Sequence, residues 1–168
     1  MIVVCSLARL PAIVKQHGAR HVVSLLADRD KVFCPEGVER NNHLWLGMDD
    51  IASEIEGMTP PGEQHVERLI EFLDRWDRKS PLVVHCFAGI SRSSAAAFIA
   101  ACATHPKKDE VVFARRIRTA SSTASPNPRL VALADRYLGR DGRMVEAIAE
   151  IGTGQMAYEA EPYVLTLD

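Results

Sequence analysis

The stretch of residues 82–102 constrains the fold more than any other part of the chain. Residues 82–84 are apolar and largely β-branched, which predicts a short buried strand. Residues 86–92 contain one glycine and predict a tight turn, and residues 94–102 are apolar on nearly every side, which predicts a buried helix. A strand that enters a helix through a short loop surrounds that loop with backbone N–H groups and the positive end of the helix dipole. The sequence therefore predicts an anion-binding loop with Cys86 at its mouth.

Cys86 and Arg92 suit this loop chemically. A cysteine at a helix N-terminus is favoured as the thiolate, which is its nucleophilic form. Arg92, six residues later, can return to the same centre and offer two parallel N–H donors to a phosphate. An inert, buried cysteine is the usual alternative for an isolated cysteine, but it leaves an arginine at the start of an apolar helix unexplained. We therefore interpret Cys86 as a nucleophile and Arg92 as its phosphate-binding partner.

The pattern His85-Cys86, then five residues, then Arg92-Ser93 resembles the signature of the cysteine-dependent protein tyrosine phosphatases. Residues 88–93 look most like the dual-specificity branch. The resemblance implies a phosphocysteine intermediate, no cofactor and no metal. It implies that Ser93 helps the thiolate to leave in the second step and that His85 orders the loop, although His85 can also be an ordinary core histidine bonded to a backbone carbonyl. The implied phosphate-binding residues are Phe87, Ala88, Gly89, Ile90, Ser91 and Arg92.

A leaving alkoxide needs a proton, so we expect a general acid on a loop before the cysteine. The candidates are Asp28, Asp30, Asp49 and Asp50. The phosphatase family places its acid on a mobile loop a few tens of residues upstream, which favours the last two, with Asp50 ahead of Asp49. The alternative is that both aspartates cap the following segment.

Downstream of the loop, Pro126-Asn127-Pro128 resembles an element of the dual-specificity phosphatases in which the asparagine side chain braces the cysteine loop. The alternative for Asn127 is an ordinary helix cap before a proline in the first turn.

Elsewhere, strands alternate with helices first and only helices follow. We expect further strands at 2–5, 21–26 and 43–48, and further helices at 7–16, 63–79, 109–120, 128–138 and 141–150. This order predicts an α/β fold with a small, mostly parallel central sheet flanked by helices, and with the phosphate-binding loop between a central strand and the buried helix. The length favours a single phosphatase-like domain, residues 1–168, whose irregular tail at 152–168 docks on the body.

Composition limits the partners and the setting. The net charge of −2 and the lack of a basic run argue against nucleic acid. The longest apolar run, 95–103, is too short to cross a bilayer, and the N-terminus lacks the basic segment of a signal peptide. Four widely spaced cysteines fit no metal template and suit a reducing, cytoplasmic setting. Cys5 ends the first strand and could trap oxidised Cys86 as a disulfide if the two strands are neighbours.

Four functions compete on this evidence. A phosphatase acting on phosphoprotein explains every residue of the motif. A phosphatase of a small-molecule or lipid phosphate is less favoured, because residues 87–91 lack lysines. A catalytically silent phosphate-binding module conflicts with the intact Cys86, Arg92 and Ser93. A rhodanese-like sulfur transferase also uses a cysteine loop, but it leaves His85 and the Arg92-Ser93 pair unexplained.

Overall fold

Five strands form one sheet in the order β3-β2-β4-β1-β5. The computed structural model describes residues 1–168. The first four strands run parallel, whereas β5 is antiparallel to β1. Since β4 lies at the centre, the residues that follow it stand at the carboxyl edge of a parallel sheet, where such folds bind ligands. The strands are β1 (Ile2–Ser6), β2 (His21–Leu25), β3 (His43–Leu46), β4 (Leu82–Cys86) and β5 (Tyr163–Leu165).

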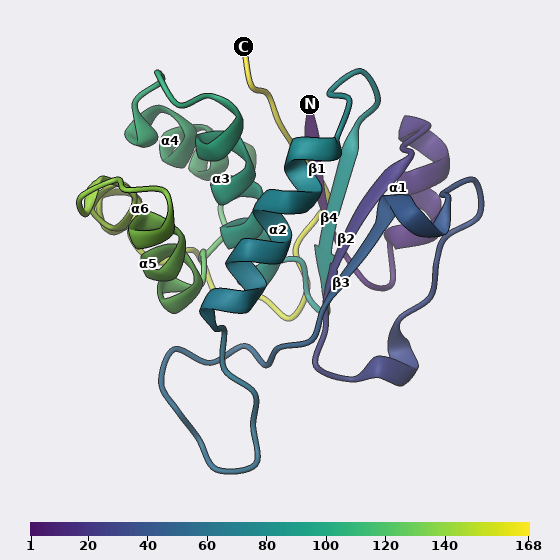
Figure 1. Ribbon diagram of the computed structural model, residues 1–168, viewed down its shortest axis with the longest axis horizontal. Coiled ribbons are helices and arrows are strands. Elements are labelled where there is room, and N and C mark those ends of the chain that lie inside the picture. Colours follow the sequence, from purple (N-terminus) through teal and green to yellow (C-terminus); the bar gives the residue numbers. More distant parts are fainter.

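Six helices flank this sheet. In Figure 1, α1 lies on one side of it and the other helices lie on the opposite side. None of the helices is long and apolar enough to span a bilayer. The helices are α1 (Leu10–His17), α2 (Glu63–Arg75), α3 (Arg92–Thr104), α4 (Glu110–Ala120), α5 (Pro128–Tyr137) and α6 (Arg143–Ile151); two 3₁₀ turns, η1 (Arg29–Lys31) and η2 (Arg40–Asn42), lie between β2 and β3.

The sheet separates two hydrophobic cores, because successive side chains of a strand point to opposite faces. Val4 and Val84 join the larger core with α3, whereas Val3 and Val83 join a smaller core under α1. The helix α3 is buried along nearly its whole length between the sheet and the surrounding helices. This position explains why its sequence is apolar all round rather than on one stripe.

The predicted α/β architecture is confirmed, and the differences lie at the ends of elements and in the tail. The helix expected to reach residue 79 ends at Arg75, and the chain then turns through Arg78 with a positive φ of 58°. The tail at 152–168 was expected to be irregular, which is wrong for Tyr163–Leu165, because these residues form β5. Three residues are too few to display the alternation of a strand, and pairing with β1 decides their conformation.

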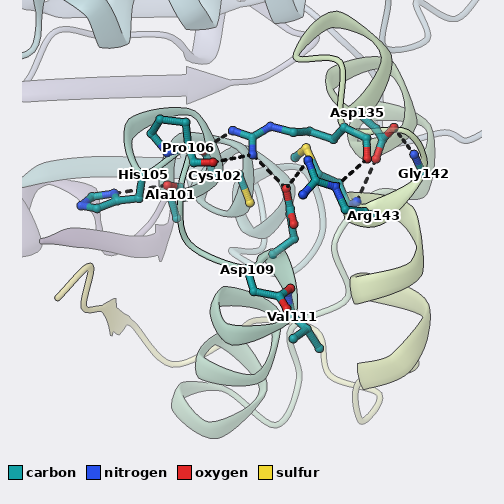
Figure 2. Close-up of polar contacts among 12 residues, drawn as sticks. Ala101, Cys102, His105, Pro106, Asp109, Val111, Asp135, Gly142 and Arg143 are labelled. Carbon is teal, nitrogen blue, oxygen red and sulfur yellow. Dashed lines mark hydrogen bonds and ion pairs between the residues drawn. The ribbon is translucent and has the colours of Figure 1, made fainter.

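A buried ion pair fixes the end of α3 that lies away from the cysteine. Arg140 donates from Nη1 to Glu110 Oε1 at 2.9 Å and from Nη2 to the carbonyl of Cys102, also at 2.9 Å. Figure 2 shows these contacts beside Asp135, which accepts the backbone N–H groups of Gly142 and Met144. The charges are therefore buried in partnership, as buried charges must be. The network joins α3 to α4, α5 and α6, and so supports the helix that carries the site.

Candidate active site

The loop of residues 87–91 turns its carbonyl oxygens outward. Four of its carbonyls accept backbone N–H groups from other segments. These bonds are Leu7 N to Phe87 O (3.2 Å), Ala160 N to Ala88 O (2.9 Å), Ser125 N to Ile90 O (3.1 Å) and Asn127 N to Ser91 O (3.3 Å). All peptides are trans, and a trans peptide points its N–H opposite to its C=O. The N–H groups of residues 88, 89, 91 and 92 therefore face away from these partners, toward the centre of the loop, as an anion site requires.

Gly89 is required by the shape of the loop. Its φ is +76°, in the left-handed region that side chains rarely adopt. A Cβ at this position would lie 2.9 Å from the backbone carbon of Cys5 and from the nitrogen of Ser6. The loop can therefore pack against the end of β1 only with glycine here.

Cys86, Ser93 and Arg92 meet at the base of the loop. Cys86 is the last residue of β4, and its Sγ lies 3.2 Å from Ser93 Oγ in the first turn of α3. The Arg92 side chain is buried, and its Nη1 donates to the carbonyl of Met48 at 2.8 Å. Its Nε is also buried but has no hydrogen-bond partner in the protein. A buried guanidinium donor without a partner is costly, so this N–H is suited to bind an anion in the loop.

Asp50 faces the cysteine loop, whereas Asp49 does not. Asp50 Oδ1 accepts hydrogen bonds from Ser91 Oγ at 2.7 Å and from Asn127 Nδ2 at 2.9 Å. Asp49 instead uses its Oδ2 and its backbone N–H to close the 50–58 loop on Thr59, both at 2.7 Å. Of the two neighbouring aspartates, Asp50 is thus the one whose side chain contacts the cysteine loop.

The Asn127 side chain caps a helix, as one alternative expects, but the part of Asn127 that contacts the cysteine loop is its backbone rather than its side chain. Its Oδ1 caps α5 by accepting the N–H of Leu130 at 3.0 Å. Its backbone N–H donates to the carbonyl of Ser91. Its Nδ2 donates to Asp50 and, at 3.3 Å, to the carbonyl of Ile51. The side chain therefore braces the aspartate, and the backbone braces the loop.

Behind the cysteine, His85 belongs to a chain of three polar side chains. Its Nε2 lies 2.6 Å from Ser24 Oγ, and the same hydroxyl lies 2.8 Å from His43 Nε2. Burial lowers the pKa of His85 to about 4, and the nearby His43 and Arg92 act in the same direction. His85 is therefore neutral near pH 7. Ser24 and His43 were not predicted; the only sequence signal is a serine inside the otherwise apolar run 22–26.

Cys5 lies on the strand next to Cys86 but on the other face of the sheet. The register pairs Cys5 with His85, and Cys5 belongs to the core under α1, whereas Cys86 belongs to the larger core. Burial raises the pKa of Cys5 to about 12, and the neighbouring Cys86 adds to this effect. The proposed disulfide would need one thiol to cross the sheet, so the structure argues against it.

At the rim of the loop, Phe87, a predicted phosphate-binding residue, meets Lys31, and the tail residues 159–160 approach; neither Lys31 nor the tail was predicted at the site. Phe87 is 59% exposed, and Lys31 Nζ lies 5.5 Å from the centre of its ring. On another side the C-terminal tail approaches, with Ala160 bonded to the loop and Glu159 accepting a 2.6 Å hydrogen bond from Ser6 Oγ. These are contacts between segments far apart in sequence, and no local pattern reveals them.

Comparisons with known proteins agree with this geometry. Residues 56–132 match the family model described as protein-tyrosine phosphatase, and this stretch contains the whole cysteine loop. The structure of human DUSP28 is 18% identical with a TM-score of 0.63, covering 83% of this chain and 88% of that one. PTPMT1 in complex with PI(5)P is 17% identical with a TM-score of 0.60, covering 90% and 92%.

A third solved structure, human tyrosine phosphatase-like serine/threonine/tyrosine-interacting protein, is 22% identical with a TM-score of 0.56, covering 82% of this chain and 87% of that one. At such identities the likeness concerns the fold. No curated protein matches the sequence of this chain.

Proposed function

We propose that this chain, whose residues 56–132 match the protein-tyrosine phosphatase family model, hydrolyses phosphomonoesters on proteins through a phosphocysteine intermediate, in the manner of the dual-specificity phosphatases. The observation that carries the proposal is the convergence of three chemical groups on one loop. Cys86 lies at its base, Arg92 offers a buried unpaired Nε, and Asp50 is bonded to Ser91. A nucleophile, a charge stabiliser and a proton donor are the parts that phosphoryl transfer requires.

In the first step, the Cys86 thiolate attacks phosphorus while the leaving oxygen departs in line. The inward N–H groups of the loop and the guanidinium of Arg92 bind the equatorial oxygens, so the site stabilises charge without having to reorganise. A bidentate arginine is well matched to two such oxygens.

Asp50 supplies the proton that the leaving oxygen needs. Both hydrogen bonds that Asp50 accepts, from Ser91 and Asn127, go to Oδ1. Oδ2 forms no hydrogen bond within the protein, so it is the oxygen free to carry the proton to the substrate. Asn127 positions Asp50 through this contact.

In the second step, water attacks the phosphocysteine and the Cys86 thiolate leaves. Asp50, now ionised, accepts a proton from that water. Ser93 Oγ, 3.2 Å from the sulfur, donates a hydrogen bond to the developing thiolate and so lowers the barrier of this step. His85 is neutral and orders the end of β4, from which the cysteine projects.

The proposal is tested with p-nitrophenyl phosphate. We expect turnover that vanadate blocks and that a chelator leaves unchanged, because Arg92 and the loop amides carry the charge of the phosphate. Cys86→Ser should abolish turnover, whereas Cys102→Ser, which changes a buried cysteine at the far end of α3, should leave it near normal. Binding of phosphate without any turnover would instead identify a silent phosphate-binding module.

A second candidate substrate is a lipid phosphate. Lys31 beside Phe87 places a cation at the mouth of the loop, in addition to Arg92, and a structural neighbour has been solved in complex with PI(5)P. A panel of phosphotyrosine and phosphoserine peptides beside soluble phosphoinositides separates the two. Peptide hydrolysis that exceeds lipid hydrolysis in kcat/KM supports the protein phosphatase, and the reverse order supports the lipid phosphatase.

A further inference from the structure

A cationic pocket lies beside β3, separate from the cysteine loop. It encloses about 410 Å³ between η1, η2 and the edge strand, a volume within the range of small-molecule sites. In β3, Leu44 and Leu46 enter the large core, so His43 and Trp45 point to the other face of the sheet. The residues that line this β3-edge pocket are Arg29, Val32, Cys34, Arg40, His43 and Trp45.

The charges of the β3-edge pocket are all positive or potentially positive. Neither Arg29 nor Arg40 forms an ion pair, and no carboxylate is among the lining residues. The guanidinium of Arg29 lies 4.5 Å from the centre of the Trp45 ring, which holds it in place through a cation–π contact. Two arginines that share no carboxylate, one of them fixed, are suited to bind the oxygens of a phosphate.

His43 connects this pocket to the catalytic cysteine. Its ring lines the pocket, and its Nε2 contacts Ser24 Oγ, which in turn contacts His85 Nε2. The residue after His85 is Cys86. His85 Nδ1 is buried beside the backbone of Cys86 and has no hydrogen-bond partner of good geometry. This series of side-chain contacts thus ends at a buried ring nitrogen beside the backbone of Cys86.

We propose that the β3-edge pocket binds the phosphate group of a small molecule and that His43, Ser24 and His85 communicate its occupancy to Cys86. That this coupling matters for catalysis rests on the proposed function. Phosphate binding and the coupling themselves can both be measured without an assay of hydrolysis.

The coupling follows because the Ser24 hydroxyl has a single proton and can donate it to only one of the two histidines at a time. With an empty pocket, burial lowers the pKa of His43, and Arg29 lowers it further, so His43 is neutral and its Nε2 accepts from Ser24. Ser24 then accepts from His85 Nε2–H. Besides Ser24, the titratable and charged groups near His43 are His85, Cys34 and the two arginines of the pocket, and a bound phosphate offsets the charge of the arginines. His43 then takes a proton from solvent.

Protonated His43 donates from Nε2, so Ser24 must turn its own proton toward His85 Nε2. The proton of neutral His85 moves, by exchange with solvent, to Nδ1. There the N–H faces the backbone of Cys86, and the positive end of its dipole favours the thiolate through that backbone. Phosphate binding should therefore make Cys86 more reactive.

Cys34 provides a direct test of binding, because it is exposed and lines the pocket. Its alkylation by iodoacetamide is followed by mass spectrometry, with inorganic phosphate as the probe and chloride keeping the ionic strength constant. At about five times Kd only about one pocket in six is free, so alkylation should slow about sixfold. Vesicles containing phosphatidic acid form a second arm, which tells a lipid headgroup from a soluble phosphate.

The matched variants remove two charges each. Arg29→Gln with Arg40→Gln should abolish the protection of Cys34 by phosphate and leave hydrolysis in the absence of phosphate unchanged. Arg68→Gln with Arg75→Gln, which changes two exposed arginines of α2, should keep the protection. Equal protection in wild type and in the Arg29/Arg40 variant would overturn the site.

The coupling is read from imidazole ¹⁵N chemical shifts, which show which ring nitrogen carries the proton. Phosphate should move the His85 proton to Nδ1 in the wild type. The shift should be lost in the Arg29/Arg40 variant, where phosphate still reaches the cysteine loop, and in Ser24→Ala, where Cys34 is still protected. Protection of Cys34 without any change at His85 would overturn the coupling, and failure of hydrolysis with both signals intact would count against the proposed function alone.

Discussion

Protonation of His85 should lower the free energy of unfolding by an amount set by the difference between the pKa of His85 in the folded and unfolded states. Burial lowers the pKa of His85 to about 4 from its ordinary value of 6.5. Between these values the unfolded chain binds a proton that the folded protein excludes, so stability rises with pH in this window. The contribution is complete above about pH 6.5 and is lost as pH falls toward 4. Two and a half pKa units correspond to about 3 kcal/mol, of which about 2 kcal/mol is lost by pH 5.

The measurement compares wild type with His85→Asn, which cannot titrate. Urea unfolding followed by the fluorescence of Trp45 and Trp76 gives the free energy of unfolding of each protein at about pH 7 and pH 5. The other buried histidines titrate in both proteins and cancel in the difference. The stability advantage of wild type over the variant should therefore shrink by about 2 kcal/mol between the two pH values. An advantage that is constant or grows on acidification would refute a buried, neutral His85.

Three further predictions concern the loop and its proton donor. Asp50→Asn should slow phosphotyrosine hydrolysis far more than that of p-nitrophenyl phosphate, whose phenolate leaves unaided, and should remove the alkaline limb of kcat/KM; Asp49→Asn is the control, and the acid is elsewhere if Asp50→Asn keeps that limb. Arg92→Lys keeps the charge but loses the planar fork, so kcat should fall about 10²–10³-fold; a near-normal kcat would reduce Arg92 to a simple attractor of anions. Gly89→Ala should lower the free energy of unfolding by about 1–3 kcal/mol in urea titrations, because a left-handed φ and a backbone contact must both be relieved; unchanged stability would show that the loop tolerates a Cβ.

The cysteine loop was predictable because its determinants are local. The strand, the glycine and the apolar helix follow one another within residues 82–102, and each carries its own pattern in the sequence. The choice of Asp50 over Asp49 was also made from the sequence, and the structure places Asp50 against Ser91. The family resemblance favoured this pair over Asp28 and Asp30, but two adjacent aspartates have no difference in local pattern that would rank one above the other.

The contacts around the loop were not predictable in the same way. Ser24 meets His85 from 61 positions away, and a serine within an apolar strand does not reveal its partner. The two strands of Cys5 and Cys86 are neighbours, which is the condition for the disulfide, but the face on which Cys5 lies depends on register. A shift of one residue moves every side chain to the opposite face, and the observed register places Cys5 beside His85 instead.

Trapping the covalent intermediate tests the central claim most directly. Acid quenching during turnover of a ³²P-labelled phosphopeptide, followed by mass spectrometry, should find phosphate on Cys86. Ser93→Ala should accumulate more of it, because the hydroxyl 3.2 Å from the sulfur assists only its breakdown. Turnover with no labelled cysteine, or label on any residue other than Cys86, would contradict the mechanism.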